Sequence, residues 1–227
     1  MKKVFTYAIL PIVIVVLAYL IYSSIMQPVR FNKEKANREA VAIQQLKDIR
    51  TLEVAYKSVF AKFTADPDSL KEFYNNGEME VVMQIGSLDD SAAVANTERI
   101  RKSGKKVTNE QLFEMYKKGE KNLVFSIKSK VPVKESILVG REDFDINKIG
   151  VIPFSDGAKV QMAEVIKKVS GVDVPLFEAK MPYDNLLNGM DHQLIVNLKA
   201  ERADTGRYPG LMVGSIDNPN NNAGNWE

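Results

Sequence analysis

The side chains that could do chemistry are few in this chain, and the densest group of them lies near the C-terminus. The segment GSIDNPNNNAGNWE carries one carboxylate and several amide side chains within a few positions of one another. Calcium prefers oxygen ligands from carboxylates, amides and backbone carbonyls. One hypothesis is therefore a calcium site at Asp217, Asn220 and Asn222. The simpler interpretation is a turn without metal, since asparagine-rich turns are common.

Catalytic and cofactor motifs are otherwise missing from the sequence. The single histidine, His192, follows Asp191, but a serine–histidine–aspartate arrangement needs three groups that converge, and no G-x-S-x-G elbow is present. A zinc site normally needs several histidine or cysteine ligands, whereas the chain has one histidine and no cysteine. Neither G-x-x-x-x-G-K-[ST] nor G-x-G-x-x-G occurs. We therefore expect neither an enzyme nor a resident cofactor, and an anchored enzyme with carboxylate chemistry is the weakest alternative.

The balance of charge narrows the classes of partner. The chain has 31 basic and 29 acidic side chains, which gives a formal net charge of +2. A nucleic-acid binder would usually show a basic excess on one domain. We expect no nucleic-acid partner.

The N-terminal segment predicts where the protein resides. No charged side chain occurs between Val4 and Val29. About 20 apolar residues in a helix span a bilayer core of roughly 30 Å. A cleaved signal peptide is the alternative, but its apolar region is typically about 7–15 residues long. The segment Tyr22–Gln27 also offers no small-x-small cleavage site. We predict a retained signal-anchor at residues 1–29.

The orientation of this anchor follows from the lengths of its flanks. Lys2 and Lys3 precede the apolar run and several basic residues follow it, so the positive-inside rule does not decide. A three-residue tail is rarely translocated, whereas long domains cross largely regardless of charge. We expect a single-pass protein of the inner (cytoplasmic) membrane with its C-terminal domain outside the cytoplasm.

A helical stalk is predicted at residues 30–76. Good helix formers dominate, and neither glycine nor proline occurs between Phe31 and Ala65. Apolar residues recur at helical spacing and form a stripe, which we regard as an interaction surface: Leu46, Ile49, Leu52, Tyr56 and Val59. The stripe could be a coiled-coil seam between copies or the face on which the following domain packs. The imperfect heptad favours packing, and Glu53 beside the stripe is expected to be solvated.

The remaining residues, 77–227, are predicted to form a strand-rich distal domain. A capping segment that begins at Thr108 predicts a helix through 118, and Asp66 or Asp68 can cap a short helix through Phe73. Residues 159–170 fit either a strand or a helix and are expected to pair with 172–179 through a turn at Ser170-Gly171. Short strands are predicted at 78–85, 123–128, 137–139, 149–154, 172–179, 194–198 and 211–216. The predicted fold class is α+β, with an N-terminal transmembrane helix that continues into a long amphipathic helix packed on a mainly antiparallel β-sheet domain.

This organisation resembles a type IV pilin or a type II secretion pseudopilin. The apolar anchor leads into a helix that ends in AYKSVFAKFTADPDSL, and strands follow. Tyr56, Lys62-Phe63 and Asp66-Pro67 stand where such proteins carry a Y-x(n)-G-x-Y-P-like stretch. Val4 precedes Phe5 where a prepilin has glycine, and Ile9 stands in place of the pilin glutamate. The resemblance covers roughly residues 4–75.

The resemblance implies a function without catalysis. It implies a structural or assembly component of an envelope or secretion apparatus, whose partners are the bilayer, other envelope proteins and possible further copies in a homo-oligomer. Some pseudopilins bind calcium near this end of the chain. The alternative is a membrane-anchored binding or adaptor module with a dimerising stalk.

Overall fold

The computed structural model describes residues 10–102 and 107–227. They form two compact units. Unit 1 comprises Met1–Lys71 and Asp143–Glu227, and unit 2 comprises Glu72–Glu142. Residues 77–227, predicted as one strand-rich domain, are thus divided between the two units. The boundaries predicted at residues 29 and 76 stay predictions.

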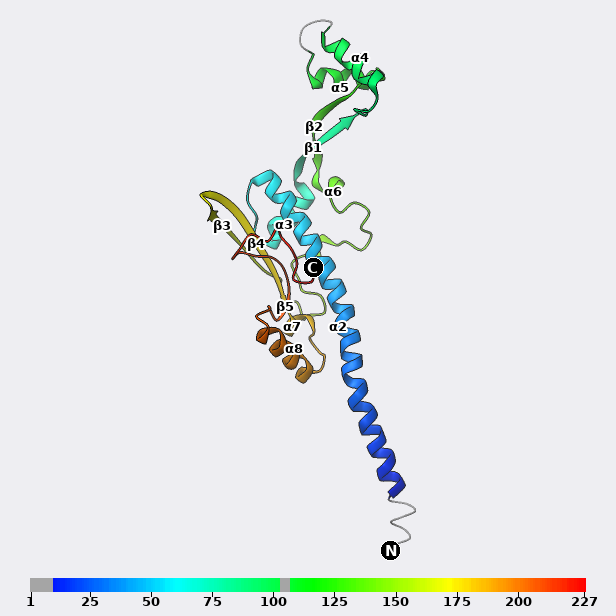
Figure 1. Cartoon of the computed structure of the whole chain (residues 1–227), viewed down its shortest axis with the longest axis vertical. Coiled ribbons are helices and arrows are strands. Elements are labelled where there is room, and N and C mark those ends of the chain that lie inside the picture. Colours follow the sequence, from blue (N-terminus) through cyan, green and yellow to red (C-terminus); the bar gives the residue numbers. More distant parts are fainter. Residues whose placement is uncertain (1–9, 103–106) are drawn as a thin grey trace. The chain divides into compact units, whose positions relative to one another are not determined.

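One continuous helix, α2 (Leu10–Phe60), contains the described part of the apolar segment and the predicted stalk as far as Phe60 (Figure 1). The rest of the stalk, predicted to residue 76, breaks at Ala61, whose φ is 58°, and resumes as a second helix at Pro67. Pro28 lies inside this helix, so the helix is not interrupted there. The apolar part is long and hydrophobic enough to cross a membrane. Every residue from Leu10 to Ile25 is exposed, and the first buried side chain is that of Phe31. The predicted long N-terminal helix is confirmed.

The sheet of unit 1 has three antiparallel strands in the order β3-β4-β5. They are β3 (Gln161–Val169), β4 (Val172–Pro182) and β5 (Gly210–Gly214). Ser170 and Gly171 both have positive φ, 51° and 86°, as a two-residue hairpin turn requires. The register pairs Val169 with Val172 across this turn. The predicted hairpin is confirmed, and the ambiguous segment 159–170 contains a strand.

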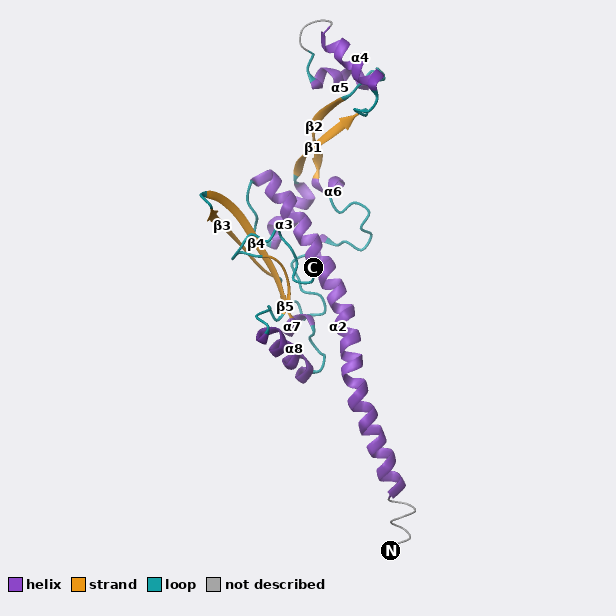
Figure 2. Cartoon of the chain, viewed as in Figure 1, coloured by secondary structure: helices purple, strands orange, loops and turns teal. Residues whose placement is uncertain are grey.

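The core of unit 1 lies between α2 and this sheet. α2 contacts β4, β5 and the short helix α7 (Tyr183–Leu186). The central strand β4 is buried on both of its faces over Leu176–Ala179. The rings of Phe63 and Phe177 lie 4.8 Å apart between their centroids. The α+β class with antiparallel strands is therefore confirmed, with the strands divided between two separate sheets (Figure 2).

Residues 194–198, predicted as a strand, lie in helix α8 (His192–Asp204). The Asp191 side chain caps this helix by accepting a hydrogen bond of 3.0 Å from the Leu194 backbone N–H. A run of five residues, four of them apolar, is too short to show a period that separates strand from helix. The prediction was wrong because the cap just before the run decides the conformation.

Unit 2 is built on a two-stranded antiparallel sheet of β1 (Glu78–Ile85) and β2 (Phe125–Pro132). Between these strands lie α4 (Ser91–Lys102) and α5 (Asn109–Lys117). Thr108 and Gln111 form a capping box at the start of α5, as the sequence predicts. The small hydrophobic core of unit 2 consists of Ile85, Leu112, Leu123 and Phe125. The predictions of strands at 78–85 and 123–128 and of a helix at 108–118 are confirmed within a few residues.

Two further predicted strands are absent from the described structure. Residues 137–139 follow the short helix α6 (Val133–Ser136), and Leu138 has a positive φ of 57°. Residues 149–154 follow the 3₁₀ helix η2 (Ile146–Lys148), and only Val151 forms an isolated bridge, with Lys159. Positive φ at a non-glycine residue is incompatible with extended strand.

The helix α3 (Pro67–Asn76) follows α2 after a short connection and has residues in both units. The Asp66 carboxylate accepts hydrogen bonds of 3.1 Å from the backbone N–H groups of Asp68 and Ser69. This is the cap that the sequence predicts for this helix.

Candidate functional site

The apolar stripe on α2 is packed within unit 1 along most of its length. The side chains of Leu46, Ile49 and Leu52 are fully buried, whereas Tyr56 is half-buried and Val59 is 41% exposed. These positions face β4 and β5, which α2 contacts. The three fully buried side chains are therefore part of the core of unit 1 and do not form a free seam.

Polar side chains of α2 bind the loops of unit 1. Gln45 Nε2 lies within hydrogen-bond distance of three backbone carbonyl oxygens, at 2.9 Å from Lys148, 3.0 Å from Ile149 and 2.8 Å from Val151. Arg38 donates to the carbonyl of Asn188 at 2.8 Å. Sequence reasoning missed these contacts because the partners lie more than 100 positions away in the chain. They hold the irregular segments of unit 1 against one face of α2.

Arg50 forms a third such contact at the C-terminus. Its guanidinium lies 2.7 Å from the Glu227 carboxylate and donates to the Asn222 carbonyl at 3.3 Å. The C-terminal tail also pairs with the sheet through an isolated bridge between Val213 and Gly224. The last residues of the chain are thus fixed to both α2 and β5.

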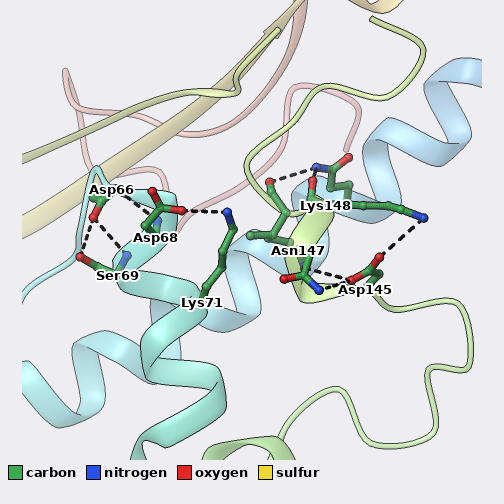
Figure 3. A network of polar contacts seen from close by, with 9 residues as sticks. Asp66, Asp68, Ser69, Lys71, Asp145, Asn147 and Lys148 are labelled. Atoms are coloured by element: carbon green, nitrogen blue, oxygen red, sulfur yellow. Dashed lines mark hydrogen bonds and ion pairs between the residues drawn. The ribbon is translucent and has the colours of Figure 1, made fainter. Parts of the chain in front are cut away.

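The carboxylates near the start of α3 and η2 act as structural acceptors (Figure 3). Ser69 donates to Asp66 through its hydroxyl and backbone N–H, which holds the pKa of the Asp66 carboxyl below its usual value. Asp145 accepts from the Asn147 backbone N–H at 3.0 Å, which lowers its pKa as well. Figure 3 shows these as two separate clusters. Both aspartates therefore act as helix caps in this structure.

Glu53 is the unexpected titratable group of this region. The sequence favoured a solvated side chain, but Glu53 is fully buried. Its Oε2 accepts a hydrogen bond of 3.1 Å from the Thr64 backbone N–H, and its Oε1 has no hydrogen-bond partner in the described part of the chain. Burial, together with the nearby charge of Glu164, raises the pKa of Glu53 to about 8, although the Thr64 hydrogen bond opposes the shift. The carboxyl is therefore mainly neutral at pH 7.

The spacing of the stripe could have identified this burial. Glu53 lies four residues after Ile49 and three before Tyr56, so it continues the three-and-four spacing of the stripe itself. Sequence reasoning gave its charge more weight than its position. A carboxyl at such a position is tolerated because it can be neutral, at the cost of a raised pKa.

The predicted calcium ligands lie in a loop that cationic side chains already hold. Lys167 donates to the Asp217 carbonyl at 3.0 Å and lies 3.8 Å from its carboxylate. The Asn220 side-chain amide donates to the Ala223 carbonyl at 3.3 Å. The Asn222 carbonyl accepts from Arg50, as described above. A calcium ion would compete with two cations for these oxygens, and the calcium site stays a prediction.

His192 and Asp191 lie at the end of unit 1 nearest the apolar part of α2. Besides capping α8, the Asp191 carboxylate accepts a 2.5 Å hydrogen bond from Gln27 Nε2. The backbone N–H of Leu194 lowers the pKa of Asp191. His192 is exposed on the first turn of α8. The Asp191 carboxylate therefore binds both the first turn of α8 and the α2 side chain Gln27.

The chain matches no known family model, no curated protein and no solved structure.

Proposed function

We propose that this chain is a single-pass protein of the bacterial inner membrane whose two units lie outside the cytoplasm. In this proposal it is a non-enzymatic structural or assembly component of an envelope or secretion apparatus, similar to a pseudopilin. The bilayer, other envelope proteins and further copies of the chain are its partners.

One observation carries the proposal, which is the change of environment along α2. From Leu10 to Ile25 the helix is apolar and exposed, and from Phe31 onward one face of the same helix forms the core of unit 1. Removing a Val, Leu or Ile side chain from water is worth about 1.5–3 kcal/mol. A segment with this many exposed apolar side chains therefore requires an apolar surrounding, and a bilayer supplies it. The continuous helix then connects the bilayer rigidly to the folded unit.

Assembly can be tested by cysteine cross-linking, because the chain has no cysteine of its own. Cysteines are placed between Ile12 and Tyr22, singly at successive positions and in pairs on opposite sides of the helix, and are oxidised in native membranes. The proposal predicts that the paired variants form species of more than two copies, and that the dimer yield of the single variants recurs with helical period. Lys168→Cys on β3 is the matched control, and it should stay monomeric. Paired variants that stop at dimers, or single variants that cross-link uniformly along the segment, would contradict assembly through the anchor.

A membrane-anchored adaptor that dimerises through its stalk is the second candidate. Val54, Val59 and Phe60 are 48%, 41% and 50% exposed on α2, so they offer an apolar surface outside the core of unit 1. This candidate predicts efficient disulfide dimers from Val54→Cys and none from cysteines in the apolar segment. The two patterns distinguish the candidates in one set of variants.

A further inference from the structure

The covering of α2 by unit 1 begins where the apolar segment ends. Ile25 is 61% exposed, Met26 is the first half-buried residue, and Phe31 is 8% exposed. Only one exposed turn of helix, Gln27–Arg30, separates Met26 from Phe31. A unit held away from a membrane on a stalk would show a much longer exposed polar stretch.

Two hydrogen bonds attach one end of unit 1 to this part of α2. Gln27 donates to Asp191, and Arg38, about 16 Å farther along the helix axis, donates to the backbone carbonyl of Asn188. Figure 1 shows α7 and α8 at the end of unit 1 nearest the apolar part of α2. Asp191 and the first turn of α8 are therefore level with Gln27, just beyond the apolar segment.

The length of the apolar segment indicates where Gln27 and Asp191 lie relative to a bilayer. The described part of the apolar segment, Leu10–Met26, extends roughly 25 Å along α2, against a hydrocarbon core of about 30 Å. The hydrocarbon then ends within about one turn of Ile25. Gln27 falls in the headgroup layer, which is roughly 5–8 Å thick on each side. Asp191 lies at the same depth because it is hydrogen-bonded to Gln27.

The basic side chains at this level suit anionic lipid headgroups. Arg30 and Lys33 are exposed and lie three residues apart, on the same side of α2. Arg38, farther along the helix, differs from this pair because its guanidinium is bound to the Glu34 carboxylate at 3.0 Å. Basic residues just outside a membrane span are attracted to the negative surface potential of anionic lipids.

We propose that the membrane-proximal face of unit 1, formed by Arg30–Lys33 and Asp191–Gln193, lies in the lipid headgroup layer and binds anionic phospholipid headgroups through Arg30 and Lys33. This inference rests on the proposed membrane anchor. It adds that unit 1 lies directly on the bilayer. An envelope protein that binds unit 1 must therefore do so at the membrane surface.

The test uses the complete chain in vesicles of phosphatidylethanolamine and phosphatidylglycerol. A fluorophore is attached to Gln193→Cys, and nitroxide lipids quench it from either the headgroup or the acyl chain. The inference predicts strong quenching by the headgroup nitroxide and weaker quenching by the acyl-chain nitroxide. Lys168→Cys is the matched control. It precedes the β3–β4 turn, and β4 runs from that turn over Val172–Pro182, about 35 Å of strand, to α7. The control should not be quenched by either lipid.

A third position separates this inference from the anchor on which it rests. A label on Val16→Cys should be quenched by the acyl-chain nitroxide. If Val16→Cys is quenched while Gln193→Cys behaves like the control, the anchor stands and the inference is overturned. If Val16→Cys is not quenched, the proposed membrane crossing itself fails.

The choice of lipid tests the role of the basic pair. Nitroxide-labelled phosphatidylglycerol should quench Gln193→Cys more than nitroxide-labelled phosphatidylcholine at the same mole fraction. Replacing Arg30 and Lys33 by glutamine should bring this ratio close to one, whereas Lys47→Gln, farther along α2, should leave it unchanged. A ratio that does not fall in the double variant would contradict headgroup binding by this pair.

Discussion

The buried carboxyl of Glu53 predicts an unusual dependence of the stability of unit 1 on pH. In the folded chain its pKa is about 8, against an ordinary value of 4.5. A raised folded-state pKa means that the unfolded state releases this proton at lower pH than the folded state does. The contribution to stability is therefore complete below pH 4.5 and is lost progressively as the pH rises to about 8.

The size of this effect follows from the difference between the two pKa values. One pKa unit corresponds to about 1.4 kcal/mol, so the full loss is about 5 kcal/mol, of which about 3 kcal/mol is lost by pH 7. The substitution Glu53→Gln removes the titration and keeps an oxygen that can accept from the Thr64 N–H. The variant should match the parent chain within about 1 kcal/mol at pH 5 and exceed it by about 3–5 kcal/mol at pH 8.5.

Urea unfolding of the complete chain in detergent micelles measures this difference. Trp226 is the only tryptophan and belongs to unit 1, so its fluorescence reports that unit alone. The pH range from 5 to 8.5 isolates Glu53. The lowered pKa values of Asp66, Asp145 and Asp191 act at more acid pH, and the pKa of Tyr208, raised by burial to about 12, acts at more alkaline pH.

The matched control for this experiment is Glu201→Gln on α8, which removes an exposed carboxylate. It should leave the slope of stability against pH unchanged. The reasoning is refuted if the parent chain keeps constant stability from pH 5 to 8.5. It is equally refuted if Glu53→Gln loses as much stability over this range as the parent chain does.

Three further predictions concern the core, the loops and the orientation. Leu52→Ala and Ile49→Ala should each destabilise unit 1 by about 2–5 kcal/mol at any protein concentration, with exposed Val54→Ala below about 1 kcal/mol; stability that rises steeply with concentration would favour the dimerising adaptor instead. Gln45→Ala should cost about 0.5–1.5 kcal/mol in the same urea assay, because it removes the hydrogen bonds to three loop carbonyls, of which only that of Ile149 is half-buried, and an effect no larger than that of Lys47→Ala would contradict its role. A membrane-impermeant maleimide should label Lys168→Cys in intact spheroplasts, and labelling only after lysis would show that unit 1 faces the cytoplasm.

Patterns that are local in the sequence predicted much of the fold. The long helix α2 follows from good helix formers without glycine or proline, and the β3–β4 hairpin follows from Ser170-Gly171 between two apolar segments. The capping box at Thr108 likewise depends only on residues close together in the chain. In each case the side chains that decide the conformation lie within a few positions of the backbone they control.

The features that were missed depend on partners far away in the chain. The β1–β2 sheet pairs Ile85 with Phe125, across 40 residues whose own pattern says nothing of this register. The contacts of Gln45 and Arg38 with loop carbonyls depend on the complete fold, because a backbone carbonyl leaves no mark in the sequence. The helix α8 was missed for a different reason, since a short apolar run gave no period and its cap at Asp191 was not weighed.

The candidate site likewise contains features that local sequence patterns predicted and features that they missed. The apolar stripe on α2 was identified by its spacing, and Leu46, Ile49 and Leu52 are fully buried. Glu53 was excluded because of its charge, although it shares that spacing. Burial of a carboxyl depends on whether its pKa can rise, which a pattern of residue types does not reveal.

The central claim is that the apolar part of α2 stays on the chain and crosses a membrane. The most direct test is the intact mass of the protein extracted from sodium carbonate-washed membranes. The proposal predicts that the protein remains in the washed membranes with the mass of the complete 227-residue chain, 25.5 kDa. A soluble protein whose N-terminus lies near Gln27 would contradict it, because the segment would then be a cleaved signal peptide.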